Sequence, residues 1–260
     1  MSSELPKTYW NSCKRSHPPP CRVLTVLYRD EHLIAIDKPA GLLVHRSDID
    51  RHETRFAVQL LRDQVGRRVQ PVHRLDRGTS GVLLFAFEAA TAAELGRQFE
   101  SAAVRKDYRA VVRGWPAPAG IIDHPLTRRH DDYGRPLPAS LPQAALTHYR
   151  RLAEIELPYA VEGHPSARYA LLALAPQSGR RHQLRRHLKH IAHPIVGDAT
   201  YGRGRHNRFF QQQFACNRLL LACVALSFRH PLDGREITVQ APLGDEFAAL
   251  LARFGWPVDA

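Results

Sequence analysis

Short apolar runs separated by polar turns recur along the chain, and their spacing predicts both strands and helices. Strands are predicted over 23–30, 33–41, 82–85, 107–115, 145–157, 168–176, 219–228 and 234–243. Helical spacing of apolar residues predicts helices over 54–65, 89–104, 182–193 and 245–254. Because these elements alternate irregularly and several strands follow one another closely, we expect an α/β (α+β) fold. Its central sheet should be mixed, mostly antiparallel and flanked by helices.

The first 22 residues lack this pattern. They are polar and contain three consecutive prolines, Pro18–Pro20, which exclude a helix or a central strand. We therefore predict a disordered N-terminal extension over 1–22 and one folded domain over 23–260. A second region rich in proline and glycine, 116–142, is predicted to form a long loop or insertion.

The net charge of the chain indicates which class of partner it binds. The chain has 37 Lys and Arg against 25 Asp and Glu, a net charge of +12. Because the arginines cluster, we favour a nucleic acid over an anionic membrane, for which no long basic amphipathic segment is present. No apolar stretch is long enough to cross a bilayer or to act as a signal core, so we expect a cytoplasmic protein. Nothing indicates an obligate protein partner, and we expect a monomer.

Common cofactor and metal motifs are absent from the sequence. Neither GxGxxG nor GxxxxGK[ST] occurs, so no dinucleotide or P-loop site is expected. The cysteines have no CxxC spacing and are interpreted as ordinary thiols, at Cys13, Cys21, Cys216 and Cys223.

Asp76 stands between Arg74 and Arg77 in the segment HRLDRGTSG. A structural ion pair is the ordinary interpretation of such a group. However, the apolar run that follows indicates burial beside the turn, and Gly78 and Gly81 allow another backbone or a ligand to approach closely. A carboxylate that neighbouring arginines keep ionised in such a place is a candidate nucleophile as well as a candidate salt-bridge member.

A second cluster of functional side chains lies on the helix predicted over 182–193. Its three faces are formed by Leu184, Leu188 and Ile191, by Arg181, Arg185 and Lys189, and by Arg186, His190 and His193. The first face is apolar and should meet the core, and the other two are basic. The histidines of this segment do not share one face and no carboxylate lies among them. Phosphate binding is therefore favoured over a metal site.

Three segments occur in a characteristic order: 73–81 (HRLDRGTSG), 178–185 (SGRRHQLR) and 193–198 (HPIVGD). Together with the opening segment 27–47, they resemble the signature of the RluA-type pseudouridine synthases. The resemblance extends from about Val23 to Trp256. It implies the pseudouridine synthase fold for 23–260 and, as activity, isomerisation of a uridine in RNA to pseudouridine. This chemistry requires neither a cofactor nor a metal, so none is expected.

The resemblance also implies roles for individual residues. Asp76 is the expected catalytic nucleophile, and Arg180 the basic residue that pairs with it. Tyr108 is the expected active-site tyrosine, which stacks on the target base and helps to remove its C5 proton. Arg74 is expected to help displace that base.

The remaining expected contacts are to the uracil and to phosphates. Leu219 or Leu221 should form the apolar wall of the base pocket. Phosphate contacts are expected from the basic helix, through Arg185, Arg186 and Lys189. The chain departs from the family pattern at Asp107 and at Ala222, which leaves the local contacts there open.

Within the family the chain is most similar to enzymes that modify uridine-65 of tRNA, so tRNA is the expected partner. A ribosomal-RNA uridine is the nearer alternative. A non-catalytic RNA-binding module and a metal-dependent nuclease are alternatives from other classes. The intact set of Asp76, Tyr108 and Arg180 argues against the first, and the missing carboxylates among the histidines argue against the second.

Overall fold

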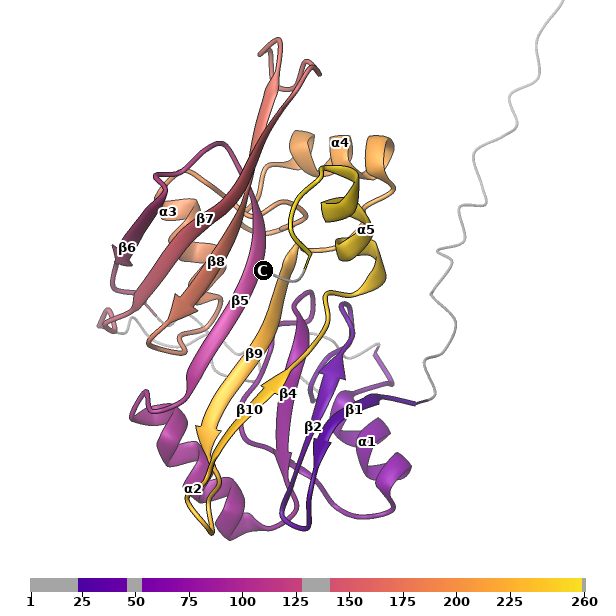
Figure 1. Ribbon diagram of the computed structural model, residues 1–260, viewed down its shortest axis with the longest axis vertical. Coiled ribbons are helices and arrows are strands. Elements are labelled where there is room, and N and C mark those ends of the chain that lie inside the picture. The colour runs from indigo at the N-terminus through magenta and orange to yellow at the C-terminus, as the bar shows by residue number, and fades with distance from the viewer. Residues whose placement is uncertain (1–22, 46–52, 128–140, 259–260) are drawn as a thin grey trace, which may run out of the picture.

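The computed structural model describes residues 23–45, 53–127 and 141–258. The chain folds around one large twisted sheet (Figure 1). Its strands are β1 (Thr25–Arg29), β2 (Leu33–Lys38), β3 (Gln70–Pro71), β4 (Ser80–Ala86), β5 (Arg105–Arg113), β6 (Ala119–Asp123), β7 (Leu146–Leu157), β8 (Ala167–Pro176), β9 (Leu221–Arg229) and β10 (Glu236–Gln240). Its helices are α1 (Ala57–Val65), α2 (Ala89–Glu100), α3 (Gln183–His190), α4 (Gly204–Phe214) and α5 (Asp245–Arg253).

The strand order is β1-β2-β4-β9-β5-β8-β7-β6, with β10 paired to β9 and β3 paired to β4. Within the described ranges every pair of strands is antiparallel except β4 with β9, which run parallel over Ser80–Gly81 and Ala222–Cys223. This arrangement confirms the predicted mixed, mostly antiparallel sheet. The short parallel contact joins the N-terminal strands to the rest of the sheet.

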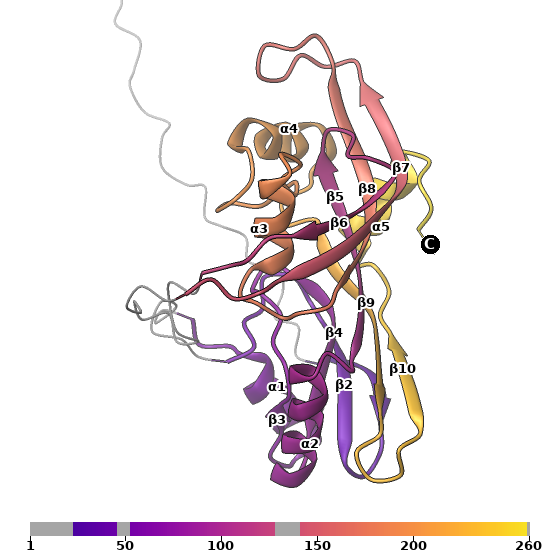
Figure 2. The same cartoon turned by 90° about the vertical axis from the view of Figure 1, so that its left-hand side faces the viewer.

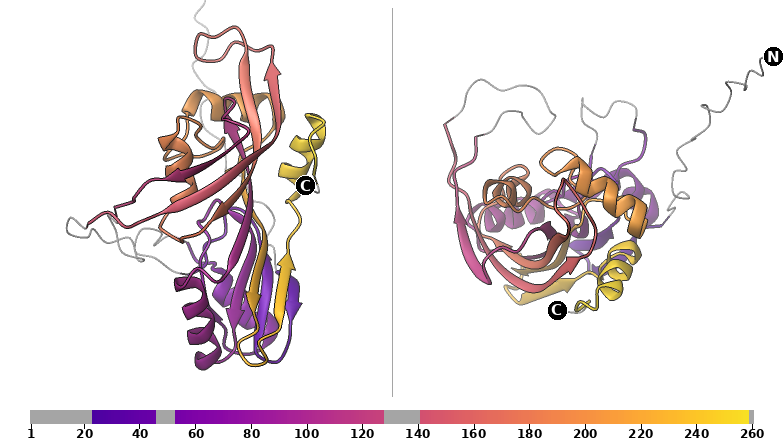
Figure 3. Two further views of the ribbon diagram at one scale, coloured as in Figure 1. Left: turned by 60° about the vertical axis from the view of Figure 1, so that its left-hand side comes forward. Right: turned by 90° about the horizontal axis from the view of Figure 1, so that it is seen from above.

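The helices cover both faces of the sheet unequally. Figures 2 and 3 show α1, α2 and α3 on one side, and α5 with the C-terminal segment on the other. β4 is buried along its whole length, as its continuous apolar sequence predicts. None of the helices in the described part of the chain is both long and apolar enough to span a bilayer.

Two elements differ from the sequence prediction. Part of the predicted loop 116–142 forms β6, which pairs with β7 at the edge of the sheet. The segment around Arg205 and Arg208, for which no helix was predicted, forms α4, which packs Phe209 and Phe210 into the core. The predicted extension over 1–22 lies outside the described residues.

Candidate active site

The loop that carries Asp76 connects β3 to β4 and is held close to β9. The backbone N–H of Thr79 donates to the Asp76 carbonyl at 3.0 Å and closes the turn. Gly81 has φ +106°, and a Cβ there would lie 2.0 Å from the Cys223 carbonyl oxygen. Only glycine permits this approach. The loop therefore enters β4 in direct backbone contact with the strand opposite.

Asp76 is held by an arginine on α3. The Nη1 of Arg185 donates to Asp76 Oδ2 at 3.0 Å, and its Nε and Nη2 donate to Asp198 at 2.7 and 2.8 Å. The Asp198 side chain is fully buried and also accepts the backbone N–H groups of Thr200 and Tyr201. Burial acts to lower the pKa of Arg185, but the bonds to Asp198 and the charge of Asp76 raise it above its usual value. Arg185 is therefore a permanent cation that orients Asp76 from a fixed position.

Arg180 does not occupy the position predicted for it. Its guanidinium Nε donates to the Ala144 carbonyl at 3.1 Å, and its side chain is exposed. The cause is local, because the side chain of Gln183 accepts the Arg180 backbone N–H at 3.0 Å and fixes the loop before α3. The prediction that Arg180 pairs with Asp76 is wrong in this structure, where Arg185 makes that pair. Arg180 still lines the cavity described next.

A cavity of about 100 Å³ lies beside Asp76 and is lined by Tyr108, Leu221, Arg180 and Arg185. A larger cavity of about 590 Å³ also borders Asp76 and is lined by Leu219 among others. The structure thus separates the two leucines that the sequence left as alternatives. Leu221 faces the tyrosine pocket, and Leu219 lies against Gly78 in the wall of the larger cavity.

Tyr108 lies half-buried on β5 with its ring between two core clusters. Burial raises its pKa well above the usual value, and the nearby Cys223 thiol and Asp76 carboxylate act in the same direction. The phenol is therefore neutral at physiological pH.

The other predicted contact residues, Arg74, Lys189 and Arg186, have different surroundings. Arg74 is exposed and lines both cavities. Lys189 is exposed on α3, 5.8 Å from the centre of the Tyr201 ring. Arg186 instead donates to the Thr127 carbonyl at 3.0 Å, so its contact in the described structure is internal.

Lys38 and His182 were not among the predicted site residues. Lys38 is fully buried, and its Nζ donates to the carbonyls of Pro39, Leu42 and, at 3.3 Å, Arg77. Burial lowers the pKa of Lys38 to about 7. The three hydrogen bonds of Lys38 tie the turn after β2 to the Asp76 loop. The sequence feature that could have identified Lys38 is its position at the end of the apolar run LIAIDK. His182 Nε2 lies 3.8 Å from Asp76 Oδ1.

The known proteins that this chain resembles are pseudouridine synthases. The sequence profile described as RNA pseudouridylate synthase matches residues 32–190. Over 254 residues the chain is 46% identical to tRNA pseudouridine synthase C of Pectobacterium carotovorum subsp. carotovorum, covering 95% of this chain and 68% of the relative. Over 237 residues it is 48% identical to tRNA pseudouridine synthase C of Haemophilus ducreyi, covering 90% of this chain and 96% of the relative.

A solved structure shows the same fold. Human RNA Pseudouridylate Synthase Domain Containing 1 superposes with a TM-score of 0.65 at 27% identity, over 87% of this chain and 86% of that one. The resemblance drawn from the three sequence motifs is therefore confirmed, and the chain belongs to the RNA pseudouridylate synthase family.

Proposed function

We propose that this protein isomerises a uridine of tRNA, uridine-65, to pseudouridine, with Asp76 as the nucleophile. One observation carries the assignment. The Asp76 carboxylate is oriented by Arg185 at 3.0 Å and borders the cavity that Tyr108 and Leu221 line. The names of the relatives, tRNA pseudouridine synthase C, support tRNA as the substrate. With this substrate, we propose that the reaction takes place in the cytoplasm.

The reaction requires no group from outside the nucleoside. The N1–C1′ bond of uridine breaks, the uracil turns within the pocket, and a C5–C1′ bond forms. The C5 proton is lost and N1 gains one, so the atoms and electrons balance. Asp76 can attack C1′ and later leave as the new carbon–carbon bond forms, or take a proton from the sugar once the base is detached. Either role needs an ionised, oriented carboxylate, which Arg185 supports.

Tyr108 and Leu221 hold the detached uracil. The aromatic ring offers a stacking surface, and the leucine an apolar wall. Because the phenol is neutral at physiological pH, Tyr108 can accept the C5 proton only while it releases its own. We therefore assign it the role of a proton relay and stacking partner rather than that of a permanently charged base.

The target uridine must leave its stack before it can enter the pocket, at a cost of a few kcal/mol. Phosphate contacts along the exposed face of α3, through Lys189, can offset this cost. Arg74, exposed at the rim of both cavities, lies where it can fill the space that the base vacates.

The direct test is the variant Asp76→Asn assayed with unmodified tRNA. We expect no detectable pseudouridine, a circular dichroism spectrum like that of the wild type, and tRNA affinity within about threefold of the wild type, a difference under 1 kcal/mol. Turnover near the wild-type rate would refute the role of Asp76.

The position modified is tested separately. Carbodiimide treatment followed by primer extension of tRNA and ribosomal RNA, from cells lacking the protein, should show loss of pseudouridine at position 65 of tRNA. A signal lost from ribosomal RNA instead would assign the enzyme to that substrate.

A further inference from the structure

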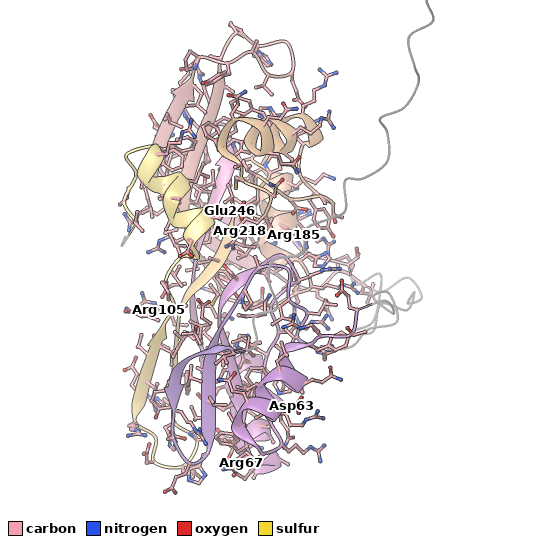
Figure 4. All side chains as sticks on the ribbon, turned by 90° about the vertical axis from the view of Figure 1, so that its right-hand side faces the viewer. Asp63, Arg67, Arg105, Arg185, Arg218 and Glu246 are labelled. Atoms are coloured by element: carbon pink, nitrogen blue, oxygen red, sulfur yellow. The ribbon has the colours of Figure 1, made fainter. Side chains whose placement is uncertain are left out.

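A second groove lies on the face of the sheet opposite the Asp76 cavities. Its volume is about 1010 Å³, and β5, β7, β8 and β9 form its floor while the segment 240–243 and α5 form a wall. Side chains alternate between the two faces of a strand. On β5, Tyr108 therefore faces the catalytic pocket while Arg105, Asp107 and Arg109 face this reverse groove. Figure 4 shows Arg105 on the side of β10 and α5, and Arg185 on the other side.

The groove owes its depth to a floor of small residues between long cationic ones. Arg109 on β5 and Arg150 on β7 are both paired with Ala173 of the strand between them. Directly paired residues share a face, so the two guanidinium side chains stand on either side of an alanine, about 10 Å apart at their backbones. Ala225 is paired with Asp107 in the same way and extends the floor.

The charge of the groove is positive. Its single carboxylate among the described lining residues, Asp107, is already 3.0 Å from Arg105. Within the described ranges the exposed side chain of Arg150 has no carboxylate or hydrogen-bond partner. Burial lowers the pKa of Arg109; the charge of Asp107 acts to raise it, and the charge of Arg150 acts to lower it. Two guanidinium groups that stand on either side of a small floor residue form a favourable site for a bridging anion.

We propose that the reverse groove binds the phosphate backbone of the substrate RNA at a distance from the target uridine, with Arg150 and Arg109 as the phosphate contacts. The proposal rests on the proposed function for the identity of the anion. Only three strands, β8, β7 and β6, separate β5 from the nearer edge of the sheet, about 15 Å at the usual strand spacing. A full-length tRNA can pass around this edge, whereas a short hairpin seated over Asp76 cannot.

The test compares two RNAs and two charge reversals. Arg150→Glu removes the proposed contact, and Arg97→Glu makes the same change of charge at an exposed arginine of α2, remote from the groove. The probes are an unmodified tRNA transcript and a short hairpin that contains only the target uridine and its stem. Affinity is measured at several salt concentrations, and kcat at saturating RNA.

For Arg150→Glu we expect about tenfold weaker binding of the full-length tRNA, with a salt slope smaller by about 1, and restoration by Arg150→Lys. Hairpin affinity should stay within about twofold, and kcat should be unchanged, because the groove does not touch the reacting atoms. Equal weakening by Arg97→Glu, equal weakening of both RNAs, or no effect on tRNA would each overturn the proposal. A wild-type protein that modifies no RNA would instead refute the proposed function. The comparison of RNA affinities between the variants could still be interpreted in that case.

Discussion

Arg185 holds Asp76 at 3.0 Å with one nitrogen while its other two nitrogens bind the buried Asp198 at 2.7 and 2.8 Å. Asp198 fixes the guanidinium, and the guanidinium fixes Asp76, the proposed nucleophile. The direction of the Asp76 carboxylate thus depends on a second carboxylate that does not itself line the tyrosine pocket.

This arrangement predicts that lysine cannot replace Arg185. A lysine has one nitrogen and cannot span both carboxylates, so Arg185→Lys should lower kcat by about 100-fold or more, roughly 3 kcal/mol of transition-state stabilisation. Arg180→Ala should lower it by less than about tenfold, since Arg180 only lines the cavity. Single-turnover assays with saturating tRNA measure both. A larger loss of kcat for Arg180→Ala than for Arg185→Lys would instead support the pairing of Arg180 with Asp76 that the sequence predicted.

Gly81 should tolerate no side chain. Alanine there would combine a φ of +106° with a Cβ 2.0 Å from the Cys223 carbonyl. Gly81→Ala is expected to lower the free energy of unfolding by about 3 kcal/mol or more. Gly96, inside α2 with no atom within 4 Å of a Cβ, is the matched control. Gly96→Ala should raise stability by about 0.5–1 kcal/mol. Urea denaturation distinguishes the two, and equal effects would contradict the close strand contact.

Lys38 should make stability depend on pH. Burial lowers its folded pKa to about 7, against 10.5 for an ordinary lysine, so between these values the unfolded chain binds more protons than the folded one. Stability contributed by this group therefore rises with pH above about 7, by about 1.4 kcal/mol per pH unit at most. Below pH 7 both states are protonated and the slope vanishes.

The measurement is urea unfolding at pH 7, 8 and 9, for the wild type and for Lys38→Met. Methionine does not titrate, so the rise should disappear in the variant even though its absolute stability is lower, because three carbonyls lose a donor. The range stops at pH 9 because burial raises the pKa of the Cys216 and Cys223 thiols to about 12, which gives the opposite slope above pH 9. Parallel curves for the two proteins would contradict the assignment.

Lys189 and Arg186 are neighbours on α3 with different expected roles. Lys189→Ala should weaken RNA binding by several-fold and reduce its salt slope by about 1, with an unchanged Tm, because the side chain is exposed. Arg186→Ala should instead lower stability by about 1 kcal/mol through the lost bond to Thr127. The opposite assignment of the two effects would mean that Arg186 is the residue that contacts RNA.

The sequence predicted the elements whose pattern was continuous and local. β4, α2 and the apolar face of α3 followed from runs and periodicity. The role of Asp76, suggested by its unusual neighbours, stays a prediction. α4 was missed because its polar residues outnumber its core phenylalanines. The choice between Arg180 and Arg185 depends on which way a loop turns, and the Gln183 side chain that decides this has no signature in one sequence.

Arg218, on the chain segment that leads into β9, donates to the Ser80 hydroxyl across a separation of 138 residues. The ribosome therefore completes the Asp76 loop long before it completes Leu221, which lines the same cavity. A nascent chain that has released only its N-terminal strands carries Asp76 without the Leu221 wall of this cavity. Under the proposed function, a nascent chain is expected to modify no RNA until synthesis has passed β9.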